Sequence, residues 1–317
     1  MSKLNKIKDL IGSKIKLSGD EDFKFLYNSG VDAFAKKDFE KAIEYFTLST
    51  QKEEKQPQAY YNLALSYQHM KEYEKAVASY SKFLEIVPND YDGLYNLGLV
   101  YFSKGNFKKA IEIFEKCVNL SMDKESIKAL ILAYLENKES QNAINFAEDL
   151  LQTYPDKIDL YYEIAKTFET KNSLSKDFTF IDTAIEMYSK LMEKDENYFD
   201  AYLSTSICYA KKGEWGMSVE FCEKALEKNP KSYEANNQMG LVYYCCNEIK
   251  EAINYYETAL ELKPVGDYKV YSNLAYAYEK IGKYDNAINM FTQLIRKFPD
   301  CPSKDEIKNH LRVIKSL

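Results

Sequence analysis

The sequence predicts an all-α protein built from repeated pairs of antiparallel helices. The first observation is a dipeptide, Tyr-Asn, that returns every 34 residues at Tyr27-Asn28, Tyr61-Asn62 and Tyr95-Asn96. A recurrence of this length is typical of stacked copies of one structural unit. The second observation is that alignment on this step gives eight segments with shared small, aromatic and proline positions. The 317 residues are therefore predicted to form an array in which each unit contacts its neighbours.

A lysine-rich segment, residues 1–22, precedes the repeats. Through Leu17 it carries five lysines against the single acid Asp9, and its apolar residues fall at helical spacing. Three interpretations remain open for it. It covers the end of the first repeat or forms a tail, it docks into an acidic groove of its own or a neighbouring chain, or it binds weakly to an anionic membrane.

Eight repeats follow over residues 23–301. Their predicted bounds are 23–56, 57–90, 91–123, 124–157, 158–198, 199–232, 233–267 and 268–301. The eighth position of each repeat is small, with Ile131 as the one misfit, and position 20 is alanine in every copy except Ser218. Aromatic residues recur at positions 11 and 24. Small residues let two helices approach closely and aromatic side chains fill the space between them, so each repeat is predicted to be a helix pair.

Glycine and proline mark the predicted helix ends. Gly105, Gly213 and Gly282 fall at position 15, where the C-terminus of a helix favours a left-handed residue. Proline at position 32 of five repeats ends the second helix, because it cannot continue the hydrogen-bond ladder. The fifth repeat has seven extra residues, which predict a longer inter-helix turn over residues 173–179.

Residues 302–317 form the predicted C-terminal capping helix. The run from Ser303 to Glu306 has the pattern of a capping box, in which serine and glutamate side chains bond the first backbone amides. Ile307, Leu311 and Ile314 then fall on one face. This pattern predicts a helix that covers the exposed end of the array.

The recurring positions resemble those of the tetratricopeptide repeat family over about residues 23–301. The resemblance implies a right-handed superhelical α-solenoid of about eight helix-turn-helix repeats. It also implies that the first helices line a concave groove, with positions 2, 5, 6, 9, 12 and 13 facing into it. Because a fold does not define a function, the functional prediction depends on the residues at these positions.

Tyrosine and asparagine at the groove positions predict a peptide-binding site. An asparagine carboxamide offers both a donor and an acceptor to an extended backbone, tyrosine adds flat apolar area, and aliphatic residues at position 9 supply pockets. This row is similar to the asparagine ladder of O-linked N-acetylglucosamine transferases, although Ala129, Glu163 and Ser204 interrupt it here. The predicted contacts are Tyr27, Asn28, Tyr61, Asn62, Leu65, Tyr95, Asn96 and Leu99, with a second patch at Gln238 and Asn273. The alternative is that the asparagines hold neighbouring repeats in register and the tyrosines pack against the next repeat.

Position 2 of the middle repeats is acidic, at Asp92, Glu125, Asp159, Asp200 and Glu234. Two interpretations remain: the N-terminal end of each helix stabilises the carboxylate, or the row selects a basic ligand. The formal net charge of −6 disfavours nucleic acid as a partner, because its phosphates would be repelled. The family's clamp for a C-terminal carboxylate is not predicted, since position 9 is aliphatic almost throughout.

We expect no catalytic residues, no cofactor and no metal site. The two histidines, His69 and His310, lie too far apart in an array to share a metal or a triad, and no phosphate-binding loop or nucleophile motif is present. The six cysteines show no C-x-x-C spacing and are predicted to be free, mostly buried thiols, with Cys245 and Cys246 more exposed.

The predicted function is that of a protein-interaction adaptor that binds an extended segment of a partner protein. The chain has no apolar run long enough to span a membrane and no secretory h-region at its N-terminus, so a cytoplasmic location is predicted. Two alternatives remain: a membrane-surface adaptor tethered by residues 1–22, and a structural assembly subunit. The sequence leaves the oligomeric state and the partner open.

Overall fold

Helices form all the regular structure in the part of the chain that the structure describes. The computed structural model describes residues 19–171, 178–263 and 267–315. Most of the predicted N-terminal segment, 1–22, and most of the turn at 173–179 lie outside these ranges. The chain divides into two compact units, residues 1–150 and 151–317, and each unit is described separately below.

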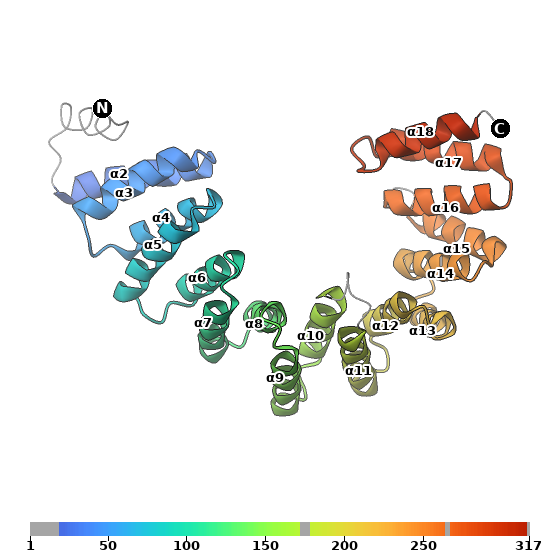
Figure 1. The fold of residues 1–317 in the computed structure, drawn as a ribbon, viewed down its shortest axis with the longest axis horizontal. Coiled ribbons are helices and arrows are strands. Elements are labelled where there is room, and N and C mark those ends of the chain that lie inside the picture. Colours follow the sequence, from blue (N-terminus) through green and yellow to red (C-terminus); the bar gives the residue numbers. More distant parts are fainter. Residues whose placement is uncertain (1–18, 172–177, 264–266, 316–317) are drawn as a thin grey trace. The chain divides into compact units, whose positions relative to one another are not determined.

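The first unit is a series of helix pairs (Figure 1). Its helices are α2 (Gly19–Ala35), α3 (Phe39–Lys52), α4 (Pro57–His69), α5 (Tyr73–Ile86), α6 (Tyr91–Ser103), α7 (Phe107–Leu120), α8 (Lys124–Glu136) and most of α9 (Ser140–Thr153), whose last three residues belong to the second unit. Each helix from α2 to α7 packs against its successor along the chain. The helix α2 begins four residues before the predicted start of the first repeat at residue 23.

The second unit continues with helix pairs of the same kind. Its helices are α10 (Ile158–Lys171), α11 (Thr179–Lys194), α12 (Phe199–Lys212), α13 (Trp215–Lys228), α14 (Tyr233–Cys245), α15 (Ile249–Leu262), α16 (Tyr268–Lys280), α17 (Tyr284–Lys297) and α18 (Lys304–Ile314). Each of these helices also packs against its successor. The predicted all-α repeat solenoid is confirmed.

In the repeats with glycine at position 8, the aromatic ring at position 24 occupies the space that a Cβ atom would take. A Cβ atom on Gly98 would lie 2.5 Å from the ring of Phe114, and one on Gly30 would lie 2.6 Å from the ring of Phe46. The fourth repeat has the opposite arrangement, with Ile131 at position 8 and the small Ala147 at position 24, both fully buried. The misfit in the sequence is therefore an exchange of a large and a small side chain.

The first helix of most repeats ends in a left-handed residue at position 15, as predicted. Gly105 has a φ of 75°. The same position is left-handed at Lys37, Lys71, Lys138 and Asn247, with φ between 58° and 66°. The next amide then donates to a carbonyl five residues back, as Glu72 does to Tyr67 at 2.9 Å. This pair of features is the Schellman motif, which satisfies the last carbonyls of a helix.

The last helix, α18, covers the apolar end of the second unit. Ile307, Leu311 and Ile314 are buried and join the core cluster that contains Phe291 of α17. The predicted capping box is wrong, because the side chain of Ser303 makes no capping hydrogen bond. Its ψ is 12°, whereas a capping side chain needs an extended backbone to reach the amides of the first turn.

All six cysteines are free, as predicted. Burial raises the pKa of Cys117, Cys208 and Cys222 to about 12, so these thiols stay protonated, while Cys245 and Cys246 are exposed. Within the described ranges, no His, Cys, Asp and Glu side chains form a group of three that would hold a metal ion. No helix described there combines the length and apolar character that crossing a membrane requires.

Candidate peptide-binding surface

The tyrosines at position 5 connect consecutive repeats in the first unit. The ring of Tyr27 packs on Phe46 of its own repeat, with 5.9 Å between ring centroids. Its hydroxyl accepts a 3.0 Å hydrogen bond from Nδ2 of Asn62 in the next repeat. Tyr61 and Asn96 repeat this hydrogen bond at 2.9 Å. These contacts match the alternative interpretation, in which the asparagines hold neighbouring repeats in register.

The Tyr-Asn row ends at the fourth repeat. Position 6 there is Ala129, whose methyl group cannot donate a hydrogen bond, so no counterpart of the Asn62 contact exists for Tyr95. Tyr95 instead stacks on Tyr91 at 5.8 Å and packs on Phe114 at the same centroid distance. The hydrogen-bonded part of the row therefore spans the first three repeats.

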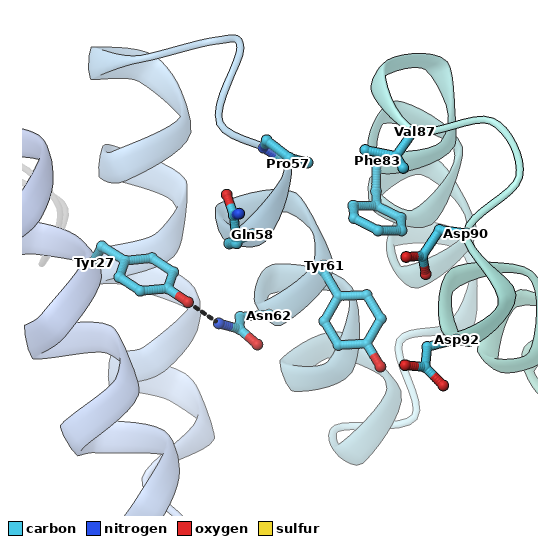
Figure 2. Close-up of a pocket in the computed structure, with 9 residues that line it drawn as sticks. All are labelled: Tyr27, Pro57, Gln58, Tyr61, Asn62, Phe83, Val87, Asp90 and Asp92. Atoms are coloured by element: carbon cyan, nitrogen blue, oxygen red, sulfur yellow. Dashed lines mark hydrogen bonds between the residues drawn. The ribbon is translucent and has the colours of Figure 1, made fainter.

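A cavity of about 440 Å³ lies beside this row, on the face that α2 and α4 present (Figure 2). Its volume falls within the range of about 300–1,000 Å³ that ligand sites occupy. Three of its lining residues are predicted contacts, and the others come from the N-terminus of α4, the C-terminal end of α5 and the start of α6. The lining consists of Tyr27, Pro57, Gln58, Tyr61, Asn62, Phe83, Val87, Asp90 and Asp92.

The remaining predicted contacts do not line this cavity. Asn28 is exposed, and the other four in the first three repeats are half-buried: Leu65, Tyr95, Asn96 and Leu99. In the second predicted patch, Gln238 is only 8% exposed, while Asn273 is half-buried. The Nε2 atom of Gln238 is buried with no hydrogen-bond partner among the described residues. A ligand on that surface would meet little of the Gln238 side chain.

The electrostatics of the cavity are set by Asp90 and Asp92, its two charged lining residues. Asp90 caps α6, because its Oδ1 accepts a 2.7 Å hydrogen bond from the backbone amide of Gly93. Asp92 lies exposed in the first turn of the same helix. Burial raises the pKa of Tyr61, and the charges of Asp92 and Asp90 raise it further. The Tyr61 hydroxyl is therefore protonated at neutral pH and can donate a hydrogen bond.

Sequence reasoning missed the cavity residues that lie outside the groove positions. Pro57, Phe83, Val87 and Asp90 belong to helix ends and to the turn before α6. A signal for them was present: Phe83 is the one aromatic residue at position 27 of the eight repeats, and Gly93 lies opposite. A Cβ atom on Gly93 would overlap the Phe83 ring, so only glycine admits that ring between α5 and α6.

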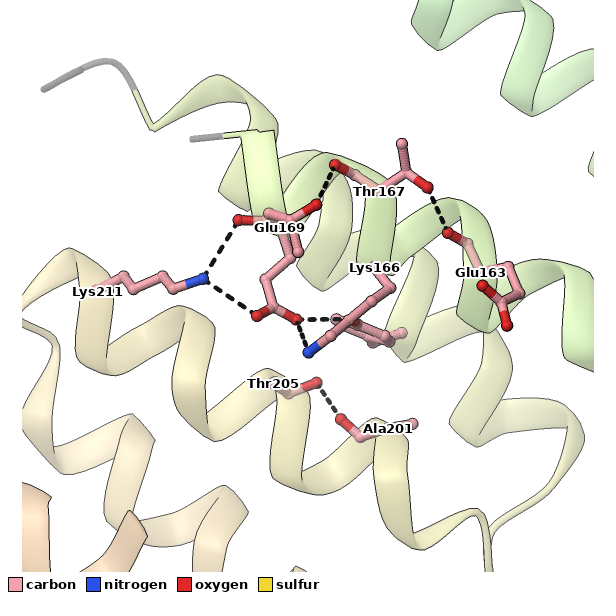
Figure 3. Close-up of polar contacts among 9 residues, drawn as sticks. Glu163, Lys166, Thr167, Glu169, Ala201, Thr205 and Lys211 are labelled. Atoms are coloured by element: carbon pink, nitrogen blue, oxygen red, sulfur yellow. Dashed lines mark hydrogen bonds and ion pairs between the residues drawn. The ribbon is translucent and has the colours of Figure 1, made fainter. Parts of the chain in front are cut away.

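In the second unit, Lys166 at position 9 of the fifth repeat belongs to an ion cluster around Glu169 (Figure 3). Glu169 is only 3% exposed and accepts hydrogen bonds from Lys166 at 2.8 Å and from Lys211 at 3.1 Å. The Tyr188 hydroxyl also donates to it at 2.9 Å. These contacts connect α10, α11 and α12. Lys166, which replaces the aliphatic residue of position 9, therefore binds a neighbouring carboxylate and does not form an apolar pocket.

The stacked helix pairs define the chain as an α-helical repeat protein. The family model of the tetratricopeptide repeat protein 21 C-terminal ARM domain matches residues 136–311, and that of the tetratricopeptide repeat matches residues 55–123. The chain belongs to the tetratricopeptide repeat proteins, as its recurring positions predict.

Individual relatives are distant. The general transcriptional corepressor ssn6 of Schizosaccharomyces pombe is 23% identical over 135 residues, which cover 42% of this chain and 12% of that protein. The peroxisomal targeting signal receptor of Saccharomyces cerevisiae is 25% identical over 179 residues, 55% of this chain and 28% of the receptor. A solved tetratricopeptide repeat protein from Parabacteroides merdae is 14% identical, with a TM-score of 0.47 and coverage of 81% of this chain and 99% of that one. The chain thus spans well under two thirds of the curated relatives it matches.

Proposed function

We propose that this chain is a protein-interaction scaffold that binds an extended peptide segment of a partner protein. The observation that carries the proposal is the cavity beside the Tyr-Asn row, which gathers Tyr27, Tyr61 and Asn62 with apolar and acidic side chains. Membership of the tetratricopeptide repeat family supports a role in protein interaction. The binding surface in this proposal is the face formed by α2, α4 and the start of α6.

The chemistry of the row suits a peptide backbone. Nδ2 of Asn62 donates a hydrogen bond to the Tyr27 hydroxyl. The carboxamide oxygen of Asn62 therefore retains acceptor capacity for a backbone N–H of the peptide. The hydroxyl of Tyr61 accepts from Asn96 and keeps its own proton, which can be donated to a backbone carbonyl. The hydrogen bonds that hold the repeats in register also fix these rotamers, so little side-chain entropy is lost when a peptide binds.

Contacts beyond the cavity are secondary in this proposal. Asn28 and Asn96 extend the row on either side, and Leu65 and Leu99 add apolar surface. The second patch is assigned a minor role, because Gln238 is buried and only Asn273 offers a half-buried amide. The scaffold role includes no catalysis and no cofactor. The relative named as a peroxisomal targeting signal receptor is consistent with peptide recognition by a chain of this kind. The cytoplasmic location stays a prediction.

Photo-crosslinking of selected peptides tests the proposal. Random linear peptides displayed on phage are panned on the full chain, and a bound peptide is resynthesised with a photoreactive benzophenone side chain. Mass spectrometry of the crosslinked product should place the adducts in α2, α4 or residues 83–96. Adducts confined to other helices, or a failure to select any peptide, would contradict the proposed binding surface.

A matched pair of variants controls this experiment. Gln58→Trp places a large side chain at the exposed rim of the cavity, and Gln152→Trp changes the same residue type at an exposed position of α9 that does not line the cavity. Crosslinking should be lost in the first variant and kept in the second. Circular dichroism confirms that both variants keep the helical content of the native chain.

A further inference from the structure

We propose that the cavity beside Tyr61 receives a lysine or arginine side chain of the bound peptide. This inference rests on the peptide-binding function proposed above and names the side chain that the surface selects. Apolar and acidic groups occupy different parts of one cavity: Pro57, Phe83 and Val87 supply apolar walls, and Asp90 and Asp92 supply the charge. Figure 2 shows both carboxylates on the side of the cavity next to Tyr61 and away from Tyr27.

The apolar walls suit the aliphatic part of a basic side chain. Lysine and arginine bury their methylene groups along apolar surface while the charged end stays in a polar environment. Phe83 is 7% exposed, and its ring lies 5.2 Å from that of Tyr61 at an angle of 60°. Aromatic faces also attract a cation that approaches within about 6 Å of the ring centroid. A long side chain that lies against Phe83 and ends in a cation therefore fits this wall.

The carboxylates supply the complement to that cation. Asp90 uses Oδ1 to accept from the Gly93 amide, and a carboxylate has two acceptor oxygens, so Oδ2 retains acceptor capacity. Asp92 is two residues further along the first turn of α6 and is exposed. Both charged lining residues are negative, so a glutamate or aspartate of the peptide would be repelled where a lysine or arginine is attracted.

A carboxylate at the N-terminal end of a helix does not by itself select a ligand. An acid at the same position of another helix, outside the cavity, separates the effect of the helix end from the effect of the cavity. Carboxylates in the first turn of any helix interact favourably with its N-terminal end. Asp200 lies at the equivalent position of α12, at position 2 of the sixth repeat, and is also exposed. It does not belong to the lining of the cavity. Asp200→Asn is therefore the matched control for Asp92→Asn.

Parallel selection of peptides tests the inference. Random linear peptides are panned on the native full chain and on the Asp90→Asn, Asp92→Asn double variant. Asparagine is as good a helix cap as aspartate, so α6 keeps its N-terminal hydrogen bond while the two charges are removed. Peptides selected by the native chain should share a lysine or arginine at one position, and those selected by the double variant should not.

Affinity measurements then assign the effect to the cavity. Fluorescence anisotropy is measured with one selected peptide and with its uncharged counterpart, in which norleucine replaces lysine or citrulline replaces arginine. Removing the peptide charge or both carboxylates should each weaken binding about three- to fivefold, which is the scale of a partly exposed ion pair. The two changes together should weaken binding no further than one alone, because they remove the same interaction. Asp92→Asn alone should also weaken binding, whereas Asp200→Asn, which removes the same single charge outside the cavity, should leave the affinity unchanged.

The outcomes separate this inference from the function on which it depends. Peptides that crosslink to the cavity but share no basic residue would overturn the inference and leave the peptide-binding function standing. An equal loss of affinity in Asp200→Asn would also overturn it, because the effect would then come from net charge and not from the cavity. If no peptide is selected by the native chain, both proposals fail.

Discussion

At the residue scale, position 5 and position 6 show how one side chain can serve both packing and recognition. Two contacts fix the side chain of Tyr27: its ring packs on Phe46, and its hydroxyl accepts a hydrogen bond from Asn62. A tyrosine held in this way presents a rigid aromatic face and a hydroxyl at a defined place. Rigid aromatic contacts lose little conformational entropy on binding, which makes structural and binding roles compatible in the same residue.

The left-handed residues at position 15 yield a prediction about stability. Lys71 has a φ of 58°, a conformation that costs a residue with a Cβ atom roughly 1 kcal/mol or more relative to glycine. Glycine also increases the conformational entropy of the unfolded chain, and this offsets part of the stabilisation. We expect Lys71→Gly to raise the free energy of unfolding by about 0.5–1 kcal/mol, measured by urea denaturation.

Gly105→Ala is the reciprocal variant for this prediction. Gly105 has a φ of 75°, and an added Cβ atom would meet no atom within 4 Å, so backbone conformation alone decides the effect. We expect Gly105→Ala to lower the free energy of unfolding by about 1 kcal/mol. Stability changes of the same sign in both variants would show that backbone strain at position 15 is not the cause.

At the element scale, the packing between consecutive repeats depends on paired side-chain sizes. Phe83 of α5 lies against Gly93 of α6. The equivalent positions of the seventh and eighth repeats are Ala259 and Val270, both fully buried. In the first case the large residue, Phe83, is on the second helix of the earlier repeat. In the other case the large residue, Val270, is on the first helix of the later repeat. Each of these two interfaces therefore contains one large and one small residue.

This pairing predicts a rescue experiment. Gly93→Val places a branched side chain where the Phe83 ring lies, and overpacking of this kind costs about 1–3 kcal/mol of stability. Adding Phe83→Ala to it recreates the Ala259 and Val270 combination. We expect the double variant to be more stable than Gly93→Val alone, as measured by urea denaturation. If Phe83→Ala lowers stability equally with glycine and with valine at position 93, the two positions are not coupled.

The Glu169 cluster gives a second prediction for elements. Glu169→Gln leaves the ammonium groups of Lys166 and Lys211 without their buried counter-charge. Both lysine side chains are more than a third exposed and can turn to solvent, which reduces the effect. We expect a loss of about 1–2 kcal/mol and faster hydrogen–deuterium exchange in α10, α11 and α12.

An exposed glutamate on α11 serves as the control for Glu169→Gln. Glu186 pairs with Lys190 on the surface, where its side chain is 58% exposed. Glu186→Gln should change stability by less than about 0.5 kcal/mol, because exposed ion pairs contribute little. If Glu169→Gln and Glu186→Gln changed the free energy of unfolding equally, the burial of Glu169 would make no difference to stability.

At the scale of the whole molecule, periodicity made most of the fold predictable and left the cavity undetected. The eightfold recurrence of alanine or serine at position 20 identifies the helix pairs, because every one of these residues is fully buried. The cavity arises from departures from the pattern, Phe83 with Gly93 and the helix-start Pro57, which an alignment of repeats treats as noise. Likewise Lys166 departs from the aliphatic residues of position 9, and its partner Glu169 lies at a position with no recurring residue. Interactions specific to one interface leave no period in the sequence.

The last helix pair, α16 and α17, has an apolar face on the side of α18. A repeat protein exposes an apolar face at each end unless another element covers it. Here α18 provides that cover: Ile307 and Ile314 are each 2% exposed, and Leu311 is 8% exposed. Nε2 of His310 also lies 2.8 Å from the Glu279 carboxylate on α16. The helix therefore attaches to two others through apolar and polar contacts.

Two substitutions on α18 test this role of the helix. Leu311→Asp places a carboxylate in the apolar contact with α17 and should cost about 2–4 kcal/mol, enough to release α18 and expose the cluster beneath it. Val313→Asp introduces the same charge on the same helix at a side chain that is 59% exposed, and should change little. Binding of a hydrophobic dye, proteolysis between α17 and α18, and concentration-dependent association measured by light scattering should all increase in the first variant alone. Similar behaviour of the two variants would mean that the end of the array is stable without its cover.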